Sequence, residues 1–194
     1  MIYGIVLGAG RGRRIGTPKA LLTLGGDTFH QRTLCAFRNA GLETVMVVNR
    51  ELMDALAATG PGEHRVVNHD PDQTGMFGSI RLGVEEAIRL GATGVILLPV
   101  DHPLVSVEDV RSLAAGLETG AAVAVATHAG RRGHPIGVNR TVMDEIAADP
   151  TVNTLREVVR RDRNRVVEVP CSEGAILGVN TKEDLERVSN RPFR

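Results

Sequence analysis

The chain has 194 residues, of which 42% are hydrophobic, so its length and composition predict one domain with a sizeable core. Its 23 basic and 23 acidic residues cancel, which gives no general attraction to nucleic acid or to an anionic membrane. Aromatic residues make up only 3%, too few for the stacking platforms that bind single-stranded nucleic acid. An anionic ligand must therefore be held by a local cluster of cationic side chains.

The sequence carries no sign of a membrane span or of export. No apolar run reaches the length of a span, and residues 2–7 are typical of a short buried strand rather than of a signal peptide. Cys35 and Cys171 belong to no Cys-x-x-Cys unit, so neither a disulfide framework nor a zinc site is expected. We expect a cytoplasmic protein, and a monomer, because nothing in the sequence demands a partner chain.

Strand-length apolar runs alternate with helical patterns over the first 117 residues. Strands are expected at 2–7, 44–48, 65–68 and 94–98, and helices at 28–40, 50–58, 78–90 and 107–117. Asp27 and Asn49 are candidate N-caps, and Ser106 with Asp109 has the spacing of a capping box. The alternation indicates βαβ units and a mostly parallel sheet that is covered on both faces.

After residue 120 the alternation loosens. Residues 121–127 and 136–138 are predicted as antiparallel edge strands around a polar loop at 128–134. Later elements are predicted as helices at 142–148, 155–160 and 182–188, with a strand at 166–169. The prediction is one α/β domain over residues 1–194, a Rossmann-like α/β/α arrangement of three layers with a small antiparallel edge.

The loop after the first strand is rich in glycine and in positive charge. Its glycines let the backbone approach a ligand, and successive N–H groups can then surround an anion; they are Gly8, Gly10, Gly12 and Gly16. Four cationic side chains fall within nine residues, namely Arg11, Arg13, Arg14 and Lys19. Since ligands of open α/β sheets bind beyond the carboxyl ends of strands, we predict a phosphate-binding loop rather than a tight structural turn.

Two other phosphate loops are excluded by a missing residue. A Walker loop ends in Gly-Lys-Ser/Thr, whereas Gly16 is followed by Thr-Pro-Lys. A dinucleotide loop needs Gly-x-Gly-x-x-Gly, but its last position is Arg13 when counted from Gly8 and Ile15 when counted from Gly10.

The stretch Leu7–Leu22 resembles the signature loop of nucleotidyltransferases similar to the molybdenum cofactor cytidylyltransferases: Leu-Ala-Ala-Gly, a variable stretch, Arg-Met-Gly-x-Pro-Lys and two leucines. It departs from that loop at Gly8 and Ile15, and it matches at Leu7, Ala9, Gly10, Arg14, Gly16, Pro18, Lys19, Leu21 and Leu22. The resemblance implies a fold like that of the nucleotide-diphospho-sugar transferases. It also implies a loop that wraps a nucleoside triphosphate, with Arg14 and Lys19 on phosphate oxygens.

A carboxylate, Asp101, directly follows the buried strand pattern at 95–100 and so faces the ligand crevice. Magnesium takes one or two carboxylates plus substrate phosphates, which suits Asp101; the alternative is an aspartate that only caps the turn before Pro103. His102 is interpreted as a bystander. The resemblance implies that Asp101 holds a Mg²⁺ ion that bridges the nucleotide phosphates.

Residues 178–184 resemble the family's Asp-Ile-Asp-Thr-Pro-Glu-Asp motif. Asn180 stands where the family often has its second metal-binding aspartate. The resemblance therefore implies that Asn180 is a metal ligand, although an amide oxygen binds the ion more weakly than a carboxylate does. The alternative is that Asn180 is a loop residue without a ligand role. Thr181 with Asp184 is predicted as a helix N-cap.

The resemblance extends to the base and acceptor sites. Within 68–79, Gly75 and Ser79 match the family's nucleobase-contacting segment, and Asn68 is counted with them; the alternative for Ser79 is a helix cap. Ala9 stands where an alanine accompanies pyrimidine nucleotides, which implies CTP. His134 lies in a Gly-His-Pro segment that faces the acceptor, while the adjoining arginines and the basic run 156–165 are interpreted as solvated.

The sequence thus predicts a Mg²⁺-dependent nucleotidyltransferase with Arg14, Lys19 and Asp101 as catalytic residues. It would move CMP from CTP to a small phosphorylated acceptor, molybdopterin being favoured, and release pyrophosphate. A guanylyltransferase, or a transferase for a sugar or alcohol phosphate, remains open. So does a non-catalytic nucleotide-binding sensor, because of Asn180.

Overall fold

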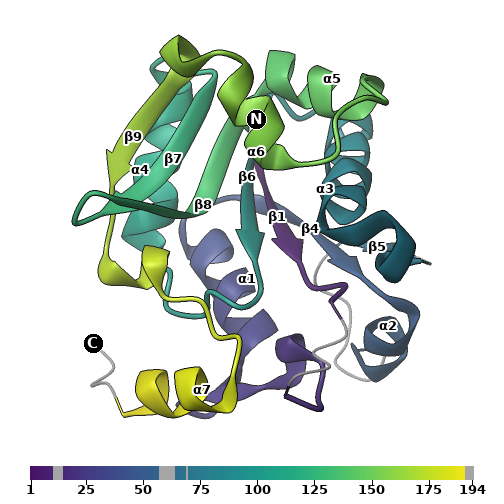
Figure 1. Cartoon of the computed structure of the whole chain (residues 1–194), viewed down its shortest axis with the longest axis vertical. Coiled ribbons are helices and arrows are strands. Elements are labelled where there is room, and N and C mark those ends of the chain that lie inside the picture. The colour runs from purple at the N-terminus through teal and green to yellow at the C-terminus, as the bar shows by residue number, and fades with distance from the viewer. Residues whose placement is uncertain (11–14, 57–63, 69, 191–194) are drawn as a thin grey trace.

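The computed structural model describes residues 1–10, 15–56, 64–68 and 70–190 and contains a seven-stranded sheet in the order β5-β4-β1-β6-β8-β7-β9 (Figure 1). The strands are β1 (Ile2–Leu7), β4 (Glu43–Val48), β5 (His64–Val67), β6 (Gly94–Pro99), β7 (Val123–His128), β8 (Arg131–Asn139) and β9 (Val166–Pro170). Of these seven, β8 alone runs antiparallel to its neighbours. The prediction of a mostly parallel sheet is confirmed.

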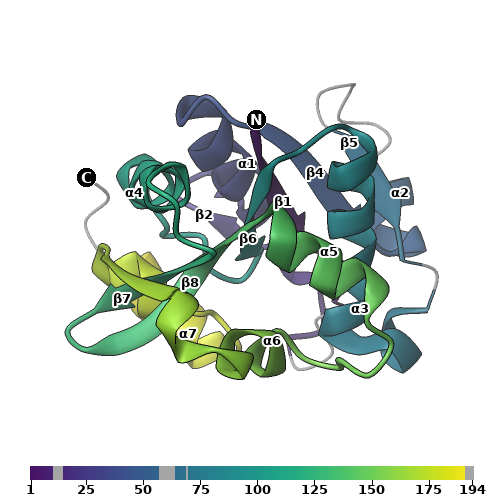
Figure 2. The same ribbon diagram turned by 90° about the horizontal axis from the view of Figure 1, so that it is seen from above.

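Helices cover both faces of the sheet (Figure 2). One face packs against α1 (Phe29–Asn39), α2 (Arg50–Leu56) and α4 (Val107–Glu118), the other against α3 (Pro71–Arg89), α5 (Arg140–Ala148) and α6 (Leu155–Arg161). Side chains alternate along each strand, so Val6 of β1 joins the first core and its neighbours Ile5 and Leu7 join the second. The last helix, α7 (Lys182–Ser189), buries Val188 in the first core. The three-layer arrangement is confirmed.

The helix caps follow the predictions with one exception. Capping boxes form at Ser106 and at Thr181, as predicted. Helix α1, however, is capped by Thr28 rather than by Asp27, because Gln31 closes the capping box with Thr28. Asp27 instead belongs to a short strand, β3 (Asp27–Thr28), which pairs with β2 (Thr23–Leu24).

The antiparallel pairing predicted for residues 121–138 is confirmed, but the position of the strands in the sheet and the extent of the loop differ from the prediction. Both β7 and β8 lie inside the sheet, and β9, parallel to β7, forms the edge. The predicted loop at 128–134 is mostly strand, because Ala129 and Gly130 adopt φ of 48° and 75° and so turn the chain within two residues. As a result, the first residues of β8 lie level with the end of β6, where Leu97 pairs with Ile136.

Helix α3 begins earlier than predicted. Asp70 caps it and Pro71 is its first residue, but the helix is broken at Gly75, whose φ of 62° and ψ of −165° are not helical. Gly75 supplies a backbone conformation that other residues rarely adopt. No helix in the described part of the chain is long and apolar enough to cross a membrane.

Candidate active site

The candidate site lies where β1 and β6 end side by side. Leu7 pairs with Pro99 across the two strands, and the N–H of Val100 donates to the Leu7 carbonyl at 3.1 Å. Ala9 and Gly10 therefore leave the sheet beside Asp101. This is the carboxyl edge of the parallel strands, where ligands of such sheets bind.

Three predicted residues meet at this edge through one ammonium group. Lys19 Nζ donates to Asp101 Oδ2 at 2.8 Å and to Asn180 Oδ1 at 2.7 Å. The Val179 N–H donates to the Asp101 carbonyl at 2.8 Å and so fixes Asn180 beside Asp101. The side chains of Lys19 and Asp101 are only 20% and 18% exposed, so their attraction is less screened than that of a surface pair.

The same oxygens have the chemistry of a divalent-cation site. Asp101 and Asn180 direct one carboxylate and one amide oxygen at a single cationic group, and Mg²⁺ and Mn²⁺ prefer such hard oxygen ligands. Among the described residues, no three His, Cys, Asp or Glu side chains gather as a metal cluster. The two residues therefore fit an ion that takes its remaining ligands from substrate phosphates and water.

A cavity of about 160 Å³ adjoins this centre, and we call it the donor cavity after the residues predicted to bind the nucleotide donor. Six of the residues predicted to bind nucleotide line it, together with Asp101; they are Leu7, Ala9, Gly10, Lys19, Gly75 and Ser79. Gly8 and Asn68 are not among its lining residues. The predicted residues Arg11, Gly12, Arg13 and Arg14 lie outside the described residues.

Gly8 has a structural role in the packing of the loop against β4. Its N–H donates to the Val47 carbonyl at 2.8 Å, so it is not free for a phosphate oxygen. A Cβ at this position would lie 3.0 Å from Met46 Cε and 3.3 Å from the Val47 carbonyl oxygen, which explains the glycine. The next residue is held by Asn49, which is 4% exposed and donates its side-chain amide to the Ala9 carbonyl at 2.9 Å. Sequence reasoning found Asn49 as a helix cap but missed this second bond.

Asn68 lies behind the donor cavity rather than in its wall. It is 2% exposed, and its amide donates to Ser79 Oγ and to Thr74 Oγ1, both at 3.0 Å. The alternative interpretation of Ser79 as a helix cap is wrong, because Asp70 caps α3 and Ser79 lies beyond the break at Gly75. Asn68 therefore ties together the two sides of the bend that places Gly75 and Ser79 in the cavity wall.

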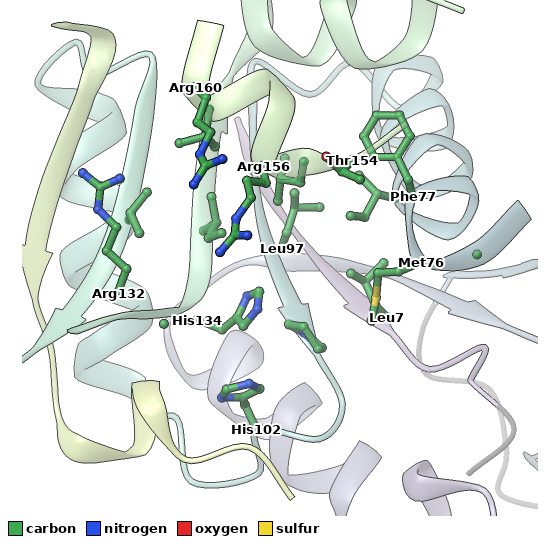
Figure 3. A pocket seen from close by; sticks show the side chains of 18 of the residues that line it. Leu7, Met76, Phe77, Leu97, His102, Arg132, His134, Thr154, Arg156 and Arg160 are labelled. Carbon is green, nitrogen blue, oxygen red and sulfur yellow. The ribbon is translucent and has the colours of Figure 1, made fainter. Parts of the chain in front are cut away.

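Figure 3 shows a larger cavity of about 720 Å³, which we call the acceptor cavity after His134, the residue predicted to bind the acceptor. It shares Leu7, Gly75, Met76 and Pro99 with the donor cavity. His134 lines it. His102, interpreted from sequence as a bystander, lines it too. Its described lining contains four arginines and no carboxylate; the arginines are Arg131, Arg132, Arg156 and Arg160.

His102 and His134 form a pair in the wall of the acceptor cavity. Their rings meet edge to face, with centroids 4.8 Å apart. Burial lowers the pKa of His134 to about 4 and also lowers the pKa of His102, so both rings are neutral at pH 7. The Nδ1 atoms of both rings are buried, and neither has a hydrogen-bond partner in the described part of the chain.

Close backbone packing sets the position of His134. A Cβ on Gly133 would lie 2.0 Å from the Ala175 carbonyl oxygen, in the short helix η4 (Glu173–Ile176). Only glycine therefore lets β8 approach η4 so closely. Sequence reasoning missed η4 as part of the site, because its residues carry no recognisable motif.

Known proteins resemble this chain over most of its length. The sequence pattern of a family described as the MobA-like NTP transferase domain matches residues 4–166. The crystal structure of Rv0371c from Mycobacterium tuberculosis H37Rv aligns over 98% of both chains, with 28% identity and a TM-score of 0.83. A manganese complex of Rv0371C aligns with 26% identity over 96% of this chain and 97% of that one, with a TM-score of 0.76.

Curated relatives have a sequence identity to this chain close to that of the solved structures. The molybdenum cofactor guanylyltransferase of Rhodobacter capsulatus is 29% identical over 98% of this chain and 96% of its own length. Purine catabolism protein PucB of Bacillus subtilis (strain 168) is 30% identical over 59% of this chain, and the match spans 60% of PucB. Since the family pattern covers most of the chain, from the first strand to the last, the protein belongs to the MobA-like NTP transferase domain family.

Proposed function

We propose that this chain transfers a nucleoside monophosphate from a nucleoside triphosphate to a small phosphorylated acceptor, with a divalent cation, and releases pyrophosphate. The observation that carries the proposal is the convergence of Lys19, Asp101 and Asn180 beside the donor cavity. That cavity shares four lining residues with the acceptor cavity, so a donor and an acceptor can meet at this edge.

The proposed reaction rests on positioning and charge neutralisation, as phosphoryl chemistry generally does. Lys19 neutralises charge that develops on the phosphates, and Gly10 leaves open space for their approach. Asp101 and Asn180 would hold Mg²⁺ or Mn²⁺, which when bound supplies further neutralisation of phosphate oxygens. The acceptor phosphate is already ionised at neutral pH, so His134 serves as a hydrogen-bonding group and not as a general base.

For the donor, we propose GTP in place of the CTP that the resemblance implied. A relative that aligns over 98% of this chain is named a guanylyltransferase, which favours GTP. Ala9, which lines the donor cavity, was the residue behind the expectation of CTP. The name of the same relative also favours an acceptor of the molybdenum cofactor type.

A thermal-shift panel tests the donor and the metal together. We expect GTP to raise the melting temperature of the wild type by several degrees only when Mg²⁺ or Mn²⁺ is present, because a ligand that binds the native state stabilises it. The Lys19→Ala variant should lose this shift, while Lys182→Ala, a change on the exposed surface of α7, should keep it. A larger shift with CTP would overturn the choice of GTP.

A second assay separates an enzyme from a sensor. Pyrophosphate release from the bound nucleotide in the presence of a molybdopterin-type acceptor and the cation supports transfer. Nucleotide binding without any release, across the acceptors tested, would instead support a non-catalytic nucleotide-binding protein.

A further inference from the structure

We infer that the acceptor carries a second anionic group, distant from the phosphate that reacts, and that Arg156 and Arg160 of α6 bind it. The inference rests on the proposed function, since it concerns the acceptor of that reaction. It also narrows the interpretation of the basic run 156–165 as mainly a solvated face.

The geometry of α6 places both arginines over one cavity. Positions 156 and 160 are one turn apart on the helix and so share a face. Both residues line the acceptor cavity, and in Figure 3 both side chains extend from α6 on the side toward His134. Their guanidinium groups are thus presented to whatever occupies the space.

Three other arginines of this region have ion-pair partners within the protein, whereas Arg131, at the start of β8, has none in the described part of the chain. Arg161 pairs with Asp149 at 2.6 Å, Arg165 with Glu145 at 2.7 Å, and Arg132 with Glu168 at 2.7 Å. Within the described residues, neither Arg156 nor Arg160 forms an ion pair. Two like charges four residues apart on a helix repel one another, and an anion bound between them would remove that cost.

The charge distribution of the acceptor cavity favours a ligand with two charged ends. Positive charge lies at α6 and at Arg131 and Arg132 of β8, and a further cation, Lys19, which pairs with Asp101, lines the neighbouring donor cavity. The wall also includes the rings of His102 and His134 and apolar residues such as Leu97 and Ile136. Guanidinium groups bind phosphate and carboxylate through paired hydrogen bonds, so a phosphate, carboxylate or similar oxyanion fits the α6 end.

Alkane-α,ω-diyl bisphosphates of four to eight carbons are suitable probes, with the corresponding alkyl monophosphates for comparison. In calorimetric titrations of the wild type, we expect at least one bisphosphate to bind about tenfold more tightly than its monophosphate. The double variant Arg156→Gln/Arg160→Gln should lose this preference. The matched control Arg163→Gln, an exposed arginine of the same run outside the cavity lining, should keep it.

Three results would overturn the inference: no preference for a bisphosphate at any length, a preference that survives in the double variant, or an equal loss in Arg163→Gln. A nucleotide titration of the same variants keeps the two proposals apart. We expect the double variant to bind GTP with its cation as tightly as the wild type does. If the wild type itself bound no nucleotide, the proposed function would fail. The bisphosphate comparison would still show whether Arg156 and Arg160 bind an anionic group.

Discussion

The donor and acceptor cavities adjoin one another but are built in different ways. The donor cavity is lined mainly by residues that directly follow β1 and β6 or lie near the bend in α3. The acceptor cavity draws on β8, α6 and η4, from the last third of the chain. A side chain at the end of a parallel strand is placed by the strand itself. A side chain on a peripheral helix is placed by packing between distant segments.

The largest effect that we expect lies on the donor side. Lys19→Ala removes the group that joins Asp101 to Asn180, and turnover should fall about 10³-fold, as when a charge-stabilising donor is removed from other active sites. The measurement is pyrophosphate release at saturating donor, with Lys182→Ala as control. Turnover of Lys19→Ala within a few-fold of the wild type would refute the catalytic role of Lys19.

The acceptor side should be the more sensitive to acid. Burial lowers the pKa of His134 from 6.5 to about 4, so the folded protein favours the neutral ring. The contribution of His134 to the free energy of unfolding is therefore fully present above pH 6.5 and is lost as the pH falls toward 4. The loss amounts to about 3 kcal/mol. Urea unfolding at pH 7 and pH 4 measures it. His134→Gln should show a correspondingly smaller loss, and an identical loss in both proteins would contradict the assignment.

Close packing at Gly133 gives a third test. In Gly133→Ala the new Cβ would meet the Ala175 carbonyl oxygen, and the free energy of unfolding should fall by about 2 kcal/mol. Gly116→Ala is the control, because its Cβ would make ordinary contacts at 3.5 Å. We expect Gly133→Ala to weaken acceptor use and to leave nucleotide affinity unchanged. A loss of nucleotide affinity without a loss of acceptor use would contradict the assignment of Gly133 to the acceptor cavity alone.

The smallest expected effect is at Ser79. Ser79→Ala removes one of the two hydroxyl groups that accept hydrogen bonds from Asn68, and should cost about 1 kcal/mol of stability. Ser189→Ala, at the exposed end of α7, should change stability by less than about 0.5 kcal/mol. Chemical denaturation of both variants gives the comparison. Equal changes in the free energy of unfolding for the two variants would show that the hydrogen bond between Asn68 and Ser79 does not contribute to stability beyond an exposed one.

The contrast between the cavities also explains what the sequence could predict. Lys19 and Asp101 stand in short motifs next to clear strand patterns, and periodicity alone predicted those strands. Asn180 is held beside them by the backbone hydrogen bond from Val179 to Asp101. Only the resemblance suggested that Asn180 lies near Asp101. For Arg156 and Arg160 no local signal exists, because the sequence shows neither which arginines of the run have a distant carboxylate, such as Asp149 or Glu145, within reach nor which of them line the cavity.

The reversed direction of β8 has a consequence for how such a protein can diversify. Because β8 begins at the edge where β1 and β6 end, the β7–β8 hairpin and α6 supply much of the acceptor wall from the continuous segment 123–161. Lys19 and Asp101 lie outside that segment. Under the proposed function, changes confined to one stretch of the gene would therefore reshape the acceptor wall and leave Lys19 and Asp101 in place.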